Sequence, residues 1–228
     1  MLRHAIALSA LLFTTTASAQ VSGSAALVSD YRFRGISLSD ERPAAQAAVA
    51  YDGRGWYTGA LVSAVRPADN LRAQLVTYLG LVRPLNPGLN WEVGADYATI
   101  AGEAGYAYSE AYLGLSSEHY SGRVSYTRHY FGQPSPALYM MLDRNWRLTD
   151  HLRVIGHLGL SRRNGNTGVE SKRYRADARA GLGMTWRDYH VQLFWTITRG
   201  SDAPYPFGYR QGSRPARQAW GLAFSRSW

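Results

Sequence analysis

Apolar and polar residues alternate with a period of two along almost the whole chain after residue 20. Between residues 21 and 34 the odd positions are largely apolar and end in aromatic residues, whereas the even positions become charged. Residues 90–100 and 174–186 repeat this alternation. A period of two is typical of β-strands that have one face in apolar and the other in polar surroundings. The pattern therefore predicts an all-β protein.

About twelve segments of this kind follow one another. We expect strands at about 21–34, 44–52, 56–65, 71–83, 90–100, 108–116, 120–130, 137–147, 152–161, 173–186, 190–199 and 216–228. Short connections rich in turn residues alternate strictly with longer, more polar ones. The short ones lie near residues 53, 87, 118, 149 and 188, and the long ones at 35–43, 66–70, 101–107, 131–136, 162–172 and 200–215. Short turns at one end, long loops at the other and an even number of strands are typical of an outer-membrane β-barrel.

The physics of a bilayer supports the same architecture. In lipid every backbone N–H and C=O must be paired within the protein, so a sheet can cross only if it closes. Aromatic residues near the ends of the apolar faces would form the interfacial girdles of such a barrel. The candidates are Tyr31, Phe33, Tyr51, Trp56, Trp91, Tyr97, Tyr120, Tyr126, Trp186 and Trp220. A soluble barrel would instead have to bury the charged faces as its core. We therefore predict a transmembrane antiparallel up-and-down β-barrel of about 12 strands, with both termini in the periplasm.

The first nineteen residues have the organisation of a secretory signal peptide. A basic start at Arg3 and His4 precedes an apolar stretch, and Ala17-Ser18-Ala19 forms a small-residue cleavage site. We expect residues 1–19 to be removed on export and residues 20–228 to form one outer-membrane domain. The chain has 13% aromatic residues and no cysteine. That composition excludes a disordered chain, a disulfide scaffold and a thiol nucleophile.

The last predicted strand ends in an aromatic residue. Trp220, Leu222, Phe224 and Trp228 share one parity, which resembles the signal by which barrel-assembly machinery recognises its clients. Arg226 departs from that pattern, since the position is usually apolar. We expect the assembly machinery to be a partner through the strand that ends in Trp228.

The region around the first strand resembles the opening of the TorF-family porins of proteobacteria. The matching residues are Ser29-Asp30-Tyr31-Arg32-Phe33-Arg34-Gly35-Ile36-Ser37, Asp40, Pro43-Ala44, Gln46, Gly55-Trp56-Tyr57, Gly59 and Ser63. The sequence departs from the family pattern at Leu38, Ser39, Leu61 and Ala64. The match covers about the first 45 residues after the signal peptide, and it implies an outer-membrane barrel.

Asp30, Arg32 and Arg34 would share the inward face of the first strand, near its outer end. Gly35 permits the sharp reversal that follows, because glycine tolerates a positive φ. One interpretation is a charged constriction at the mouth of a pore. The other is an ion-pair cluster that anchors the first loop.

Inward parity collects many further charged side chains. The candidate lumen and constriction residues are Asp30, Arg32, Arg34, Arg72, Glu92, Asp96, Glu110, Arg123, Asp143, Arg153, Arg175, Asp177 and Arg179, with Arg217 beside them. Cations and carboxylates nearly balance. They could pair across the barrel and narrow it, or an arginine ladder could face a carboxylate cluster and favour anions. Twelve strands leave room for small solutes only.

The surplus of positive charge lies mostly in the long loops. Candidate contacts to lipopolysaccharide phosphates are Arg162, Arg163, Lys172, Arg210 and Arg214. Arginine offers a planar fork that suits bidentate phosphate contacts. The alternative is simple solvated charge. No fold that reads nucleic acid is visible, so lipid and lipopolysaccharide are the expected partners.

Signals for enzymatic chemistry are weak. His129 and His157 have inward parity, and either could be a buried hydrogen-bonding residue or lie beside a carboxylate. No lipase motif or metal-ligand spacing is present. We therefore expect no catalytic residue, metal or cofactor. The sequence favours a porin-like channel for passive diffusion of small solutes, anions among them. A closed structural or adhesive barrel that displays its loops is the alternative, and a membrane hydrolase using His129 or His157 is a third hypothesis.

Overall fold

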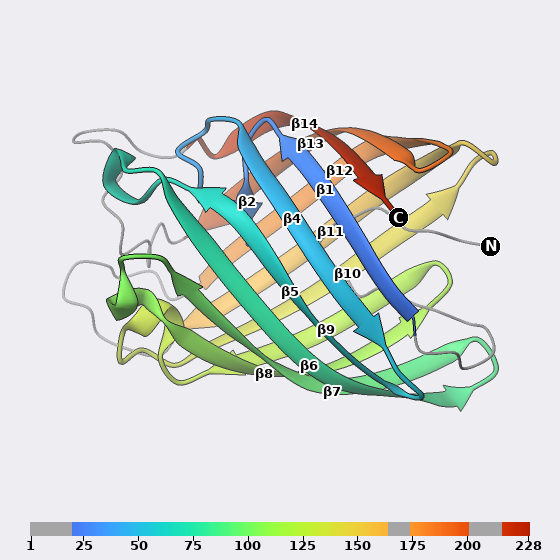
Figure 1. Cartoon of the computed structure of the whole chain (residues 1–228), viewed down its shortest axis with the longest axis horizontal. Coiled ribbons are helices and arrows are strands. Elements are labelled where there is room, and N and C mark those ends of the chain that lie inside the picture. Colours follow the sequence, from blue (N-terminus) through green and yellow to red (C-terminus); the bar gives the residue numbers. More distant parts are fainter. Residues whose placement is uncertain (1–19, 164–173, 201–215) are drawn as a thin grey trace.

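A closed antiparallel barrel of twelve strands makes up most of the computed structural model, which describes residues 20–163, 174–200 and 216–228 (Figure 1). The barrel strands are β1 (Gln20–Val28), β4 (Ala44–Asp52), β5 (Trp56–Val65), β6 (Arg72–Asn86), β7 (Leu89–Ile100), β8 (Tyr108–Ser117), β9 (Tyr120–Thr127), β10 (Ala137–Arg147), β11 (Leu152–Arg163), β12 (Tyr174–Trp186), β13 (Tyr189–Gly200) and β14 (Gln218–Ser227). Two further strands, β2 (Arg32–Phe33) and β3 (Ile36–Ser37), form a separate hairpin. The predicted all-β antiparallel barrel of twelve strands is confirmed.

The barrel closes where its first and last strands meet. β1 pairs with β4 on one side and with β14 on the other, so Leu27 lies opposite both Ala45 and Phe224. Beyond the last strand, Trp228 and Gly23 exchange two backbone hydrogen bonds of 3.0 and 3.1 Å. No edge of the sheet is left open between β1 and β14, which is the condition for placing a sheet in lipid.

The two ends of the barrel differ, as Figure 1 shows. Tight turns join β4 to β5, β6 to β7, β8 to β9, β10 to β11 and β12 to β13. The other end carries longer connections, which include the short helices η1 (Pro67–Asp69), η2 (Ala104–Tyr106) and η3 (Tyr130–Gly132). None of the helices among the described residues is long and apolar enough to cross a bilayer. The predicted alternation of short and long connections is confirmed, and we call the two ends the turn end and the loop end.

The two faces of the sheet differ as the alternation predicts. Trp220, Leu222 and Phe224 of β14 point outward and are exposed, and so are leucines on most other strands. Inward-facing positions carry polar and charged side chains that are nearly inaccessible, such as Gln74 and Glu92. An apolar exterior around a polar interior is the reverse of a soluble barrel.

The first strand ends six residues earlier than the alternation predicts. β1 stops at Val28, and residues 29–43 turn into the barrel and form the β2–β3 hairpin. Asp30 supplies the local reason, because its carboxylate accepts hydrogen bonds from Ser37 and Ser39 at 2.5 and 3.2 Å. Such side-chain bonds draw a segment away from the ladder of a sheet. We call residues 29–43 the inner loop.

The predicted place of Tyr31 and Phe33 in the lipid girdle is therefore wrong. Tyr31 is 9% exposed inside the barrel, and its hydroxyl donates to Gln74 of β6 at 3.1 Å. The Phe33 ring packs edge-on against Phe131 at 6.2 Å between centroids. By contrast, the following predicted girdle residues are exposed on the described surface: Trp56, Tyr97, Tyr120, Tyr126, Trp186 and Trp220.

The inner loop belongs to an apolar cluster within the barrel. Tyr31 and Leu38 of the loop pack with Tyr130 and Phe131 of η3. Buried residues of β4, β5, β7, β8 and β10 complete the cluster, namely Ala44, Val65, Ala98, Ile100, Tyr108 and Ala137. Burial of these side chains holds the loop inside the barrel rather than over its mouth.

Candidate functional site

A cavity of about 170 Å³ lies inside the barrel, beside the inner loop. Every one of the twelve barrel strands contributes to its lining, and so does the β2–β3 hairpin. The titratable residues that line it include the carboxylates Asp30, Asp96, Glu110, Asp143 and Asp177 and the basic residues Arg32, Arg34, Arg123, His157 and Arg179. The lumen therefore concentrates charges of both signs around one polar space.

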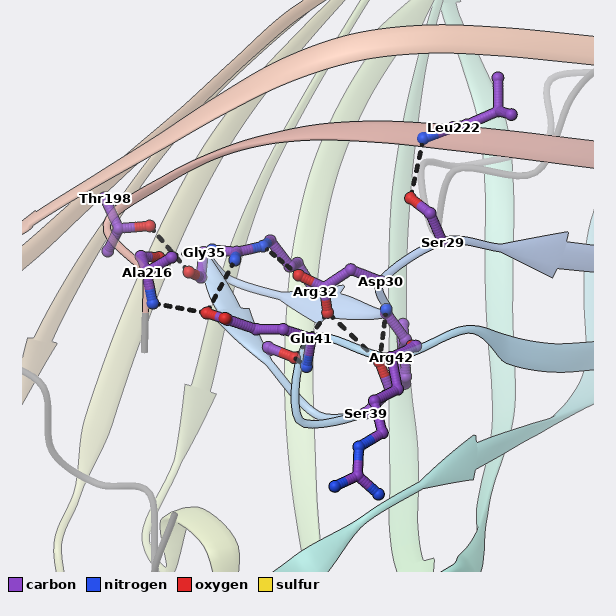
Figure 2. A network of polar contacts seen from close by, with 12 residues as sticks. Ser29, Asp30, Arg32, Gly35, Ser39, Glu41, Arg42, Thr198, Ala216 and Leu222 are labelled. Carbon is purple, nitrogen blue, oxygen red and sulfur yellow. Dashed lines mark hydrogen bonds and ion pairs between the residues drawn. The ribbon is translucent and has the colours of Figure 1, made fainter. Parts of the chain in front are cut away.

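The tip of the β2–β3 hairpin is a two-residue turn made by Arg34 and Gly35. Both have a positive φ, of 50° and 78°, as a tight hairpin turn matched to the twist of its strands requires. Thr198 of β13 donates its hydroxyl hydrogen to the Gly35 carbonyl at 2.7 Å (Figure 2). A Cβ atom on Gly35 would lie 2.7 Å from the Cβ of Asp177 on β12. The tip is thus pressed against the wall formed by β12 and β13, and only glycine fits there.

Arg34 ties the same turn to a different wall of the barrel. Its Nη1 donates to Oε1 of Glu110 on β8 at 2.9 Å, and its Nη2 donates to Oε2. Both side chains are buried, and the guanidinium lies 4.3 Å from the ring centre of Tyr139. Burial alone would lower the pKa of Arg34, but Glu110 and nearby phenols raise it well above its ordinary value. The turn therefore joins β8 to β12 and β13 across the lumen.

A second polar network holds the base of the inner loop (Figure 2). Arg32 donates from Nε to Asp30 at 2.6 Å and from Nη1 to the backbone carbonyl of Ala216 at 2.9 Å. The backbone N–H of Ala216 in turn donates to Glu41 at 2.5 Å. These contacts connect the loop to the residues just before β14. Together with the Arg34–Glu110 pair, they match the anchoring interpretation of Asp30, Arg32 and Arg34, all three of which line the cavity.

Three neighbouring strands share a histidine bridge. Nδ1 of His157 on β11 lies 2.7 Å from Oδ1 of Asp143 on β10, and Nε2 lies 3.0 Å from Oδ1 of Asp177 on β12. The Tyr139 hydroxyl also lies 3.1 Å from Nε2. Of the two possibilities considered for His157, the structure has it beside carboxylates. His129 is exposed before η3, away from this bridge.

A carboxylate–arginine pair with two tyrosines forms a further network. Glu92 accepts two hydrogen bonds from Arg123, of 2.7 and 3.1 Å, and one from the Tyr57 hydroxyl at 2.6 Å. Tyr112 stands 2.9 Å from Tyr57 and under the Arg123 guanidinium. Tyr57 and Tyr112 are not among the predicted lumen residues, because that prediction rests on charged side chains. Their inward parity was the available signal.

Four other predicted lumen residues lie apart from these networks. Arg179 and Asp96 line the cavity from β12 and β7. Arg153 faces inward near the turn end, where it contacts Thr185 and His190. Arg175 is 2% exposed on β12, and its Nε and Nη1 have no hydrogen-bond partner among the described residues.

Two predicted site residues do not lie where their proposed roles require. Arg72 is exposed at the loop-end start of β6 and is not part of the cavity lining. Arg163 was expected to contact lipopolysaccharide, but it is 8% exposed and faces Ser135 inside the barrel. Its inward parity at the end of β11 explains the difference. Arg162, the next residue along the strand, is exposed.

The remaining loop candidates, Lys172, Arg210 and Arg214, lie outside the described residues. In the part of the chain that the structure describes, no group of three or more histidine and acidic side chains could hold a metal ion.

Comparison with known proteins gives a family and a fold. A family described as "Bacterial protein of unknown function (Gcw_chp)" matches residues 13–227. The solved NanC porin superposes with a TM-score of 0.55 at 8% identity, covering 90% of this chain and 98% of that chain. The KdgM porin gives 0.53 at 10% identity, covering 91% and 98%. A structure described as "KdgM porin in complex with disordered oligogalacturonate" gives 0.52 at 9% identity, covering 91% and 97%. No curated protein matches the sequence.

Proposed function

This chain belongs to the Gcw_chp family of bacterial proteins of unknown function, and from that premise we propose that it is an outer-membrane channel for passive diffusion of small polar solutes. The observation that carries the proposal is a charge-lined cavity to which all twelve strands of a closed barrel contribute. A closed sheet that encloses polar groups provides water-like surroundings where lipid would exclude a solute.

The outer surface supports a membrane location. Large apolar side chains such as Leu79, Leu158 and Leu193 are at least half exposed on different sides of the described barrel. Exposed apolar surface of this extent is unfavourable in water and favourable in lipid. NanC and KdgM, whose folds are similar, are porins by name. The resemblance to TorF-family porins also fits this proposal. We propose export by the signal peptide 1–19 to the Gram-negative outer membrane, with both termini in the periplasm.

The inner loop would set the size limit of the channel. It contacts β8 through Arg34 and β13 through Gly35, so it crosses the space through which a solute must pass. The constriction interpretation of Asp30, Arg32 and Arg34 becomes part of the proposal in this form. Small solutes would pass beside the hairpin, along the charged groups of the cavity.

The charged side chains of the lumen indicate which charge on a solute is favoured. Most lumen carboxylates are already bound by arginine or histidine in the networks described above. Buried arginine nitrogens on Arg175 and Arg179 lack a partner among the described residues. A solute with an anionic group would supply that partner. We therefore propose that anionic groups are favoured in the lumen.

A closed structural or adhesive barrel is the second candidate. The packing of Tyr31 and Leu38 with η3, and the Arg34–Glu110 pair, favour it, because a firmly held inner loop would impede passage. An enzymatic role has no observation in its favour among the described residues, and NanC and KdgM, whose folds are similar, are porins by name.

Single-channel recording separates the two candidates. Mature protein, shown to be folded by its heat-dependent migration on a gel, is inserted into a planar bilayer. Stable current steps that increase with KCl concentration are expected for a channel. A folded barrel that inserts but carries no current would contradict the channel and support the structural role.

The proposed partners rest on surface residues. Arg162 is exposed, and with Lys172, Arg210 and Arg214 it would bind lipopolysaccharide phosphates. The strand ending in Trp228 would be recognised by barrel-assembly machinery. If the first partner is right, Arg162→Gln should lose lipopolysaccharide binding. If the second is right, Trp228→Ala should fail to assemble in the membrane.

A further inference from the structure

Two charged side chains that line the cavity, Arg179 and Asp96, take part in no close ion pair within the described chain. Every other charged group that lines the cavity takes part in one of the ion pairs described above. Among the described residues, Arg179 and Asp96 make no ion pair within 4.0 Å, although both line the cavity. Within the described part of the chain, the cavity thus offers one cation and one carboxylate that no ion pair within 4.0 Å engages.

Arg179 and Asp96 lie on opposite walls. Arg179 belongs to β12 and Asp96 to β7, and in the order of the closed barrel four strands separate them on one side and six on the other. They therefore lie on different walls of the barrel, and not side by side on one wall. Separated charges of opposite sign produce a field across a pore and orient a solute that has charges of both signs.

Arg179 offers a place for a carboxylate. Its guanidinium carbon lies over the Phe194 ring, 4.9 Å from the ring centre, in a cation–π contact. Its Nε is buried and has no hydrogen-bond partner among the described residues. A buried donor without an acceptor is unfavourable, and a planar guanidinium can bind a carboxylate through two parallel hydrogen bonds.

Asp96 offers a place for an ammonium group. It lies directly opposite Glu110 in the pairing of β7 with β8. Nη1 and Nη2 of Arg34 both donate their hydrogen bonds to Glu110. Among the described residues, Glu110 therefore has a direct cationic partner and Asp96 has none within 4.0 Å. A cation bound at Asp96 would thus relieve the repulsion between the two carboxylates.

We propose that the cavity binds small zwitterionic solutes, with their carboxylate at Arg179 and their ammonium group at Asp96. Charges on opposite walls favour solutes whose charged groups are separated, such as ω-amino acids and short peptides. The inference rests on the proposed channel and refines its solute class. The anionic group expected in the lumen is the carboxylate of such a solute.

The test uses three probes of similar length on the mature protein: γ-aminobutyrate, butyrate and n-butylammonium. In a planar bilayer each is added to one side, and the reduction of the KCl current is measured. We expect γ-aminobutyrate to reduce the current at about tenfold lower concentration than either singly charged probe, because it gains one more charge-assisted contact. Equal effects of the three probes would overturn the proposal.

Two variants assign the ends of the solute. Arg179→Gln should weaken the effects of γ-aminobutyrate and butyrate by about tenfold and leave n-butylammonium unchanged. Asp96→Asn should weaken γ-aminobutyrate and n-butylammonium and leave butyrate unchanged. Arg72→Gln, outside the cavity lining, is the matched control and should change none of them. One outcome would indicate a simple anion site and contradict the proposal. In that outcome, butyrate binds Asp96→Asn more strongly than γ-aminobutyrate binds the parent protein.

A second measurement separates this proposal from the channel itself. Thermal unfolding in detergent is followed with and without each probe, since a bound ligand stabilises the folded state whether or not current flows. The barrel could carry no current and still be stabilised by γ-aminobutyrate, with the stabilisation reduced in both variants. That result would overturn the channel and retain the site. A conducting barrel that no probe stabilises or blocks would retain the channel and overturn the site.

Discussion

Arg34 donates two hydrogen bonds to Glu110 inside the barrel, although 76 residues separate them in the sequence. Arg34 lies at the tip of a hairpin that leaves β1, and Glu110 lies on the inner face of β8. The pair therefore links the inner loop to a wall that is neither its own nor adjacent. Its removal should change both the stability of the barrel and the space in the lumen.

Arg34→Asn tests this link without disturbing the turn. Asparagine tolerates a positive φ, so the hairpin can keep its geometry while Glu110 loses its buried partner. Breaking a buried ion pair costs about 3–5 kcal/mol, so the thermal unfolding temperature in detergent should fall. We also expect larger or noisier current steps in a planar bilayer, because the hairpin loses its attachment to β8.

Arg72→Asn is the matched control for that variant. Arg72 has the same inward parity but is exposed at the loop end, outside the cavity. It should change neither measurement. Lower stability of Arg34→Asn at unchanged conductance would indicate that the pair only anchors the loop and does not limit the pore.

Gly35→Ala tests the contact of the hairpin tip with the wall. The added Cβ would lie 2.7 Å from the Cβ of Asp177, so the tip must withdraw from β12 and β13. Gly88→Ala provides the comparison, since Gly88 has a similar positive φ of 84° but nothing within 4 Å of an added Cβ. Both variants bear the strain of an alanine at positive φ, about 1–2 kcal/mol. Only Gly35→Ala should lose more than this in thermal unfolding, and equal losses would refute the close packing of the tip.

The histidine bridge predicts an effect on ion selectivity. In His157→Phe, Asp143 and Asp177 lose the ring that each of them contacts, and their carboxylates face the lumen without it. We expect the reversal potential in a KCl gradient to shift toward the equilibrium potential of potassium, because carboxylates in the lumen favour cations. The thermal unfolding temperature should also fall. His129→Phe, an exposed position at the loop end, should leave both unchanged. An unshifted reversal potential in His157→Phe would mean that this cluster lies off the ion path.

The barrel itself was predictable because each of its strands carries the same constraint. An apolar exterior and a polar interior require alternation at every residue, and so the twelve strands could be placed from the sequence. The inner loop escaped this reasoning because Tyr31 and Phe33 continue the alternation of β1. They do so inside the lumen, where an apolar cluster with Phe131 replaces lipid as their surroundings. Period alone does not distinguish these two apolar environments.

Parity also specified which charged residues face inward, but not which of them meet. The bond between Arg34 and Glu110 depends on the path of the hairpin, and the Asp143–His157–Asp177 bridge depends on strand register. Register is determined by the stagger of a closed barrel, which a single sequence does not state. Tyr57 and Tyr112 require no knowledge of register, since their inward parity is visible in the sequence itself.

Tyr31→Phe tests whether this residue lies inside the barrel. The variant loses the hydrogen bond to Gln74, which should cost about 1 kcal/mol of unfolding free energy. Burial also raises the pKa of the Tyr31 phenol to about 12, from 10.0. The unfolded chain then releases the proton first, so the associated stability is present below pH 10 and is lost as the pH rises toward 12. Denaturation in detergent at pH 8 and pH 11 should therefore show a smaller decline for Tyr31→Phe than for the parent protein. Tyr126→Phe, exposed on the outer face, should behave like the parent at both pH values. If Tyr31→Phe and Tyr126→Phe had equal stability at both pH values, Tyr31 would face lipid, and the inner loop would be contradicted.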